Sequence, residues 1–322
     1  MRQKFIHNFL LERKKNKEKR NLISKGILIP IHSFEEYSAL VKKAKHEANG
    51  PLFTNCFMMP DEIKRLISLG AFYQMKTNNG LAFIDDEGAY YYAFFYLDPK
   101  NTFQVPQLDK NILSENVYRH DKMLPNQAAF EEKLTEDGFT DNGIYYQVST
   151  VPQLSPEKFW NRLKVIEKSL QAEGKYISAP TNKQLKTFEK VYKESIDIYV
   201  QKKYSKKERK KQRDQGFLSC LTDDSGEIYA ISISAVLHGG AIASNKKYDA
   251  NGYAAAMAVK ALEGWYKAIP EDESARKEYM RCKAFGWIKS TNTASLRLHK
   301  SLGYNLTEKE MHQFVKPGYA KY

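Results

Sequence analysis

Apolar runs along the chain predict two β-hairpins of similar design. Residues 80–97 (GLAFIDDEGAYYYAFFYL) and residues 216–236 (GFLSCLTDDSGEIYAISISAV) each place an apolar strand before an acidic turn with glycine and then a second apolar strand. Turns of this composition between apolar runs are typical of hairpins. In the first hairpin the second strand has large aromatic side chains at successive positions, which predicts a strand buried on both faces.

Further elements surround both hairpins in a repeated order. In each half a helix precedes the hairpin, and a strand, a helix and a closing glycine follow it. The halves therefore share an order of elements more than a sequence. The expected segments are 60–70 (helix), 112–121 (strand) and 125–139 (helix) in the first half, and 156–172 (helix), 182–213 (helix), 241–243 (strand), 253–269 (helix), 285–288 (strand) and a short helix ending at Gly303 in the second.

Length and repetition together predict two domains of the α+β class. The 322 residues exceed one typical domain and suffice for two of roughly 150. The segment STVPQLSP around residue 150 contains two prolines and interrupts the pattern. We therefore expect domains over residues 1–150 and 151–322, each with a mixed central β-sheet flanked by helices.

Charge and cysteine content narrow the classes of function. The net charge of +13 is accounted for by residues 1–26 and 202–213, which contribute about +7 each, so a basic face across the whole fold is not indicated. The two runs could contact RNA, an anionic surface or an acidic partner, although such runs usually just solvate a helix. Three widely separated cysteines indicate neither a disulfide framework nor a metal site. With no long apolar run for a membrane span or a signal peptide, we expect a cytoplasmic protein.

The segment FGWIKSTNTASLRLHKSLGY near the C-terminus has the most informative spacing. An apolar strand ends in a Ser/Thr/Asn cluster, and Asn292 caps a short helix that stops at Gly303. Leu296, Leu298 and Leu302 are expected to be buried. The segment resembles the β5–α4 element of the GNAT acyltransferase superfamily, in which an Asn is followed at fixed spacing by a small residue, an aliphatic–Tyr pair and Gly-Phe. Here Ser295 is the small residue, and His299 stands at the position of the Tyr.

This resemblance implies tandem GNAT-like domains that transfer an acetyl or other acyl group from acyl-CoA to the amine of a small molecule or peptide. It implies that His299 protonates the departing thiolate, and that Asn292 and Ser295 contact the cofactor. The GNAT pyrophosphate loop corresponds to a turn and helix start in which Asp249 replaces the usual Arg or Gln. The residues expected to bind acyl-CoA there are Ala250, Asn251, Gly252, Tyr253 and Ala254.

Two alternatives remain open at this point. Fem-type aminoacyltransferases also combine two GNAT-like halves with a helical arm and use aminoacyl-tRNA, which the basic runs would suit. They would require Lys206 to Arg213 to project as a basic arm. A non-catalytic binding protein is the second alternative, which Asp249 and the lack of a Gly-rich loop in the first half favour. No general base stands out among His238, Glu227 and Asp249.

Overall fold

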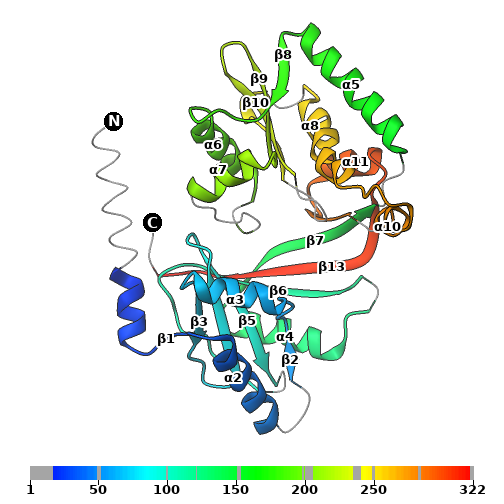
Figure 1. Cartoon of the computed structure of the whole chain (residues 1–322). Coiled ribbons are helices and arrows are strands. Elements are labelled where there is room, and N and C mark those ends of the chain that lie inside the picture. The colour runs from blue at the N-terminus through cyan, green and yellow to red at the C-terminus, as the bar shows by residue number, and fades with distance from the viewer. Residues whose placement is uncertain are drawn as a thin grey trace. The chain divides into compact units, whose positions relative to one another are not determined.

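The computed structural model describes residues 17–48, 52–98, 101–120, 122–150, 154–197, 199, 206–234, 241–248, 251–281 and 284–319. The chain divides into two compact units, which confirms an α+β architecture of two parts (Figure 1). The first unit comprises Met1–Tyr145 and Glu308–Tyr322, and the second comprises Tyr146–Thr307. No helix among the described residues is long and apolar enough to cross a membrane.

The first unit is a sheet covered by helices on both faces. Its strand order is β1-β3-β4-β5-β6-β13-β7, and β2 pairs with β5. Helices α2 and α3 pack on one face, whereas α4 packs on the other. The elements are β1 (Leu28–Pro30), α2 (Phe34–Glu47), β2 (Phe53–Thr54), α3 (Pro60–Ser68), β3 (Phe72–Met75), β4 (Leu81–Asp86), β5 (Tyr91–Leu97), β6 (Ile112–Arg119), α4 (Pro125–Glu136), β7 (Thr140–Thr150) and β13 (Asn305–Lys316).

The aromatic strand β5 lies inside this unit, as its sequence predicts. Tyr91 and Phe95 pack into the core beside α4, and Phe94 and Tyr96 pack into the core beside α2 and α3. The expected hairpin of β4 and β5 is present, with Leu81 opposite Tyr96. Because both faces of β5 are covered, its large side chains are explained by packing.

The second unit contains an antiparallel sheet in the order β11-β10-β9-β8. Helix α6 packs on one face, and α5 and α8 pack on the other. Strand β12 neighbours the part of β7 that belongs to this unit. The elements are α5 (Pro156–Ala172), β8 (Lys175–Ser178), α6 (Leu185–Ser195), α7 (Lys206–Asp214), β9 (Leu218–Asp223), β10 (Ile228–Ile233), β11 (Ile242–Ser244), η1 (Lys246–Tyr248), α8 (Tyr253–Ala261), α9 (Glu263–Lys267), α10 (Glu273–Tyr279), β12 (Ala284–Lys289) and α11 (Thr293–Ser301).

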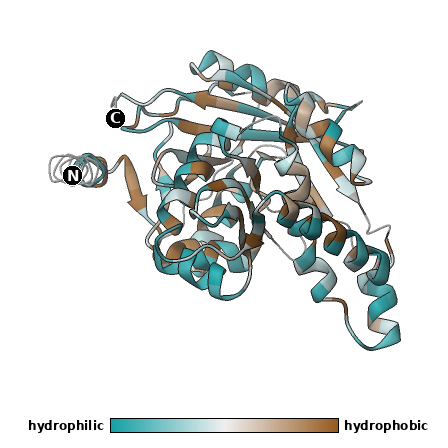
Figure 2. Ribbon diagram, turned by 90° about the horizontal axis from the view of Figure 1, so that it is seen from above, coloured by the Kyte–Doolittle hydropathy of each residue, from teal (hydrophilic) through white to brown (hydrophobic). Residues whose placement is uncertain are grey.

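Several expected elements differ in detail. Strand β3 lies between helix α3 and the hairpin β4–β5. Counted from the preceding helix, the strands that correspond to β9 and β10 are therefore β3 and β4, and not β4 and β5 as the sequence predicts. The single helix expected over 182–213 is replaced by two helices, α6 and α7. Helix α6 ends at Ser195, because Ile196 is the last apolar residue of its buried face. Tyr199 therefore lies outside the helix. Leu296, Leu298 and Leu302 are only partly buried. Figure 2 shows how hydrophobic and hydrophilic residues alternate along the helices.

The end of the chain supplies a strand to the first unit, which the sequence analysis did not anticipate. Residues 309–316 of β13 pair antiparallel with β6, from Lys309 opposite Arg119 to Lys316 opposite Ile112. Residues 308–322 therefore group with the first unit and not with the second. The boundary expected near residue 150 lies inside β7, whose residues are shared between the two units.

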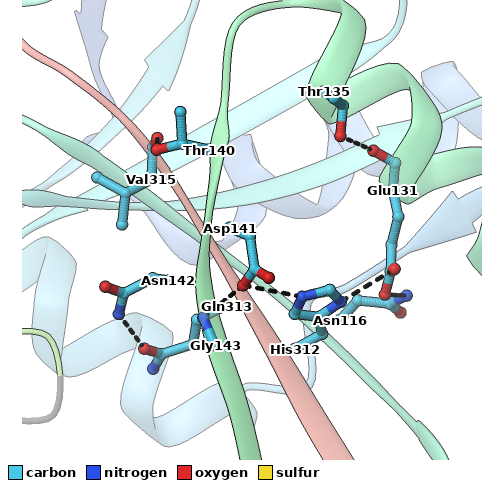
Figure 3. Close-up of polar contacts among 10 residues, drawn as sticks. All are labelled: Asn116, Glu131, Thr135, Thr140, Asp141, Asn142, Gly143, His312, Gln313 and Val315. Atoms are coloured by element: carbon cyan, nitrogen blue, oxygen red, sulfur yellow. Dashed lines mark hydrogen bonds and ion pairs between the residues drawn. The ribbon is translucent and has the colours of Figure 1, made fainter.

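A histidine on β13 bridges two carboxylates (Figure 3). His312 Nδ1 lies 3.0 Å from Glu131 Oε2 on α4, and Nε2 lies 3.0 Å from Asp141 Oδ1 on β7. Asn116 Nδ2 donates to the other oxygen of Glu131 at 2.8 Å. Burial alone would lower the pKa of His312, but the hydrogen bonds and charges of Glu131 and Asp141 outweigh it and raise the pKa above 6.5. Both ring nitrogens can donate only in the protonated ring.

We predict that this bridge contributes a pH-dependent part of the stability. Since the folded-state pKa of His312 is raised, the contribution is complete below about pH 6.5 and is lost as pH rises through the folded pKa. His312→Gln should lose about 2 kcal/mol at pH 6 and less at pH 9. Thermal unfolding of both proteins across this range measures the difference.

The exposed His46 on α2 provides a matched control, because His46→Gln removes no bridge of this kind. A stability difference between wild type and His312→Gln that is constant from pH 6 to pH 9 would contradict the prediction.

Candidate functional site

Helix α11 begins as the sequence predicts. The Asn292 side chain accepts a hydrogen bond from the backbone N–H of Ser295 at 3.0 Å, which caps the helix directly after β12. The interaction confirms the structural part of the expectation for Asn292. It uses one lone pair of the Asn292 Oδ1 atom, which leaves the amide nitrogen as the donor that this side chain could offer to a ligand.

His299 lies one turn further along α11. Its Nδ1 is 2.8 Å from the carbonyl oxygen of Ser295, so Nδ1 carries the proton and Nε2 has the lone pair in the neutral ring. Burial lowers the pKa of His299, and the bond to the Ser295 carbonyl opposes the shift only in part. The neutral ring is therefore the favoured form near pH 7, which suits a proton acceptor at Nε2 better than a standing proton donor.

Tyr304 accompanies His299 and received no role in the sequence analysis. The two rings meet edge to face, with centroids 5.1 Å apart. Tyr304 is buried with Val148 and Ile288, and burial raises the pKa of its hydroxyl. A phenol that stays protonated can donate a proton, but only geometry could have identified it, because in the sequence Tyr304 appears as the residue after a helix stop.

Helix α8 begins at Gly252, which has a left-handed backbone conformation with a φ of 73°. This conformation favours glycine, and a Cβ at this position would meet no atom within 4 Å. No side chain caps the helix. The first backbone N–H groups of α8 therefore have no side-chain acceptor, and the space next to Gly252 is open. Such a helix start suits a phosphate or another anion.

A small cavity of about 150 Å³ adjoins the start of α8. Asn251, Gly252 and Tyr253 line it, so the structure brings these three predicted residues together. The other walls come from α5 and the residue after it, namely Ile166, Ser169, Leu170 and Glu173, with Ala256 of α8. None of the lining residues comes from α11, so the two sets of predicted residues do not share this cavity.

Charged and aromatic side chains next to this cavity were missed by the sequence analysis. Lys175 Nζ on β8 lies 3.3 Å from Glu173 Oε2, and it lies over the rings of Tyr229 and Tyr253 at 5.1 and 5.4 Å. The Tyr253 hydroxyl donates to Glu173 at 3.4 Å. Lys175 therefore offsets the negative charge that Glu173 places near the helix start. The pairing of β8, β9 and β10 brings Tyr229 close to Lys175, and the packing of α8 brings Tyr253 there, which no local motif reveals.

Three residues named in the sequence analysis lie outside the described residues, namely Ala250, Asp249 and His238. Ala254 lies in the first turn of α8. Glu227 accepts a hydrogen bond from the Tyr248 hydroxyl at 3.1 Å and pairs with Lys247 at 3.6 Å. Among the described residues, no group of three or more His, Cys, Asp and Glu is placed to hold a metal ion.

Comparison with known proteins gives structural likenesses at low similarity. No protein-family model matches the chain, and no curated protein matches its sequence. A tandem GNAT protein from the clavulanic acid biosynthesis pathway is 9% identical with a TM-score of 0.46, covering 92% of this chain and 99% of its own. A GCN5-related N-acetyltransferase from Sphaerobacter thermophilus is 11% identical with a TM-score of 0.45, covering 82% and 88%.

A GNAT-family acetyltransferase from Colwellia psychrerythraea is similar at the same level. It is 11% identical with a TM-score of 0.44, and the match covers 90% of this chain and 99% of that one. At such values the three likenesses identify neither a donor nor an acceptor for this chain.

We predict that His299 and His312 titrate on opposite sides of the ordinary histidine pKa of about 6.5. His299 should titrate below it because burial disfavours the charged ring, and His312 above it because two carboxylates face its ring. An NMR pH titration of the imidazole signals measures both, with His299→Gln and His312→Gln identifying each signal. A His299 signal that titrates above pH 6.5 would remove the argument for a neutral ring.

Proposed function

We propose that the chain is an acyl-CoA-dependent N-acyltransferase that transfers an acetyl or other acyl group to the amine of a small molecule or peptide. The start of α8 carries the proposal, because Gly252 leaves the uncapped end of the helix open to an anion directly after a strand and a turn. The resemblance of the Asn292-to-Tyr304 segment to the GNAT superfamily supports the same conclusion.

The residues at the start of α8 would hold the pyrophosphate of coenzyme A. The backbone N–H groups of Tyr253 and Ala254 would donate to phosphate oxygens, and the positive end of the helix dipole would favour the charge. The free amide nitrogen of Asn292 and the hydroxyl of Ser295 would contact the donor from α11. Glu173 disfavours an anion nearby, and Lys175 offsets it.

His299 would move the proton in this reaction. The neutral Nε2 can accept a proton from the acceptor amine as its nitrogen bonds to the acyl carbon. The protonated ring can then return that proton to the thiolate sulfur released when the carbon–sulfur bond breaks. This sequence keeps the role of His299 as the donor to the thiolate and adds a source for the proton. Tyr304 is a second candidate donor beside it.

The Fem-type alternative required a projecting basic arm, and α7 does not form one. Arg209 of α7 is buried and pairs with Glu189 of α6, so the helix is anchored to the second unit. Apart from the exposed lysines of α7, no observation in the described residues favours aminoacyl-tRNA over acyl-CoA as the donor.

The first test is thermal stabilisation by acetyl-CoA and by coenzyme A. A ligand at 100 times its Kd should stabilise the wild-type protein by about 2.7 kcal/mol, because it binds only the folded state. Gly252→Glu should abolish the effect, since it adds a side chain and a negative charge at the start of α8. Turnover should be followed by release of free thiol in the presence of candidate amines.

Gly216→Glu provides the matched control. Gly216 also has a left-handed backbone conformation, with a φ of 76° and open space around a Cβ, but it follows α7. The Gly216→Glu variant should bind acetyl-CoA as the wild type does. Absence of any stabilisation of the wild type would exclude acyl-CoA as the donor, and binding without turnover for any amine would favour a non-catalytic binding protein.

A further inference from the structure

Helix α7 presents four exposed lysines on one side. Its sequence is KKERKKQRD, and Lys206, Lys207, Lys210 and Lys211 are all exposed. They stand at positions i, i+1, i+4 and i+5, which at 3.6 residues per turn lie within about 140° of the helix circumference. Because the helix rises 1.5 Å per residue, the two i, i+4 pairs are each separated by about 6 Å along the axis. We call these four residues the α7 lysine stripe.

Within the described residues, no carboxylate forms an ion pair with a lysine of the α7 lysine stripe. Exposed lysines on other helices either pair with Glu, as Lys43 does with Glu47, or stay unpaired in twos in the described part of the chain, as Lys164 and Lys168 do on α5. Helix α7 gathers four such lysines within six residues. Like charges at i, i+4 destabilise a helix by about 0.2–0.5 kcal/mol per pair. The stripe therefore reduces the stability of its own helix.

A single buried arginine anchors α7 instead of an apolar face. Arg209 is 3% exposed, pairs with Glu189, and lies 4.8 Å from the centre of the Tyr192 ring. Its Nη1 donates to Gln212 at 2.9 Å, and Arg213 Nη1 donates to Asn182 Oδ1 at 2.8 Å. These contacts fix which side of α7 faces inward, so the lysine stripe is held outward as an ordered array of positive charge.

We propose that the α7 lysine stripe is a binding surface for the phosphodiester backbone of a nucleic acid. Lysines bind phosphates as point charges and release the counterions that the phosphates had condensed, which makes such binding independent of sequence and sensitive to salt. The stripe contains no aromatic residue for base stacking, so it would contact the backbone and not the bases. The inference is independent of the acyl transfer proposed above.

Other anionic partners fit the stripe less well. Helix α7 contains no apolar side chain that could insert into a bilayer, and stable membrane attachment needs more than a short basic patch. Protein interfaces are depleted in lysine at their cores and depend on apolar or aromatic anchors, which α7 lacks. A nucleic-acid backbone requires only the regularly placed positive charge that the helix supplies.

The test compares two variants of the full chain that lose the same charge. The stripe variant replaces all four stripe lysines by Gln and keeps Arg209. The control variant replaces four other exposed lysines, which lie on α2 and α5 and form no ion pair within the described residues: Lys42, Lys45, Lys164 and Lys168. Fluorescence anisotropy with single-stranded RNA and with duplex DNA oligonucleotides, from 50 to 200 mM salt, measures binding, and circular dichroism checks that both variants are folded.

The wild type should bind at 50 mM salt, and the stripe variant should bind at least tenfold more weakly while the control variant changes less than threefold. For single-stranded RNA the slope of log K against log salt should fall by about 0.7 for each lost phosphate contact, up to about 2.8 for four. The RNA and DNA arms identify which backbone is preferred. No binding by the wild type, equal weakening in both variants, or stripe-dependent binding to phosphatidylserine vesicles alone would overturn the proposal.

Discussion

The first unit depends on a strand that comes from the far end of the chain. Gln313 on β13 is fully buried, and its Nε2 donates to Glu115 Oε1 on β6 at 2.7 Å across 198 positions in sequence. Asn142 Nδ2 on β7 donates to Gln313 Oε1 at 3.0 Å, and Tyr92 on β5 donates to Glu115. A polar ladder thus crosses four strands at the place where β13 is inserted. Without β13 its buried groups would lose their partners, which is costlier than losing apolar contacts of the same area.

This ladder also fixes the register of β13. A slip by one residue would move Gln313 from the polar ladder to the face of His312, and it would move His312 away from Glu131 and Asp141. The pairing of β13 with β6 closes a long loop, and the entropic cost of closing a loop grows only slowly with its length. Long-range pairing of this kind therefore slows folding more than it lowers the free energy of unfolding. The first unit can therefore be completed only after the residues of β13 have been synthesised.

Local patterns predicted the elements whose stability is local. The hairpins β4–β5 and β9–β10 and the helices α3, α4 and α5 follow from apolar spacing, turn composition and caps, and Asn292 caps α11 as expected. The missed features depend on distant partners. Strand β13 begins NLTEKE, a segment with one apolar residue, Leu306, which is exposed, and its place in the first unit is set by β6 and β7. Helix α6 ends at Ser195, where its packing against the sheet of the second unit stops. The charge and spacing of its residues alone do not reveal this end.

The candidate site shows the same division between local and distant causes. The open helix start at Gly252 could be predicted from sequence, whereas the charge around it depends on Glu173 and Lys175, which the fold brings there. His299 and His312 are the same residue type with opposite surroundings. His312 has a carboxylate at each nitrogen and holds its proton, whereas His299 has a carbonyl at Nδ1 and nothing charged to offset its burial. A protonated His312 between two carboxylates helps to hold β13 against α4 and β7. A neutral ring with its lone pair at Nε2 can accept a proton and pass it on, and that difference makes His299 the better candidate for chemistry.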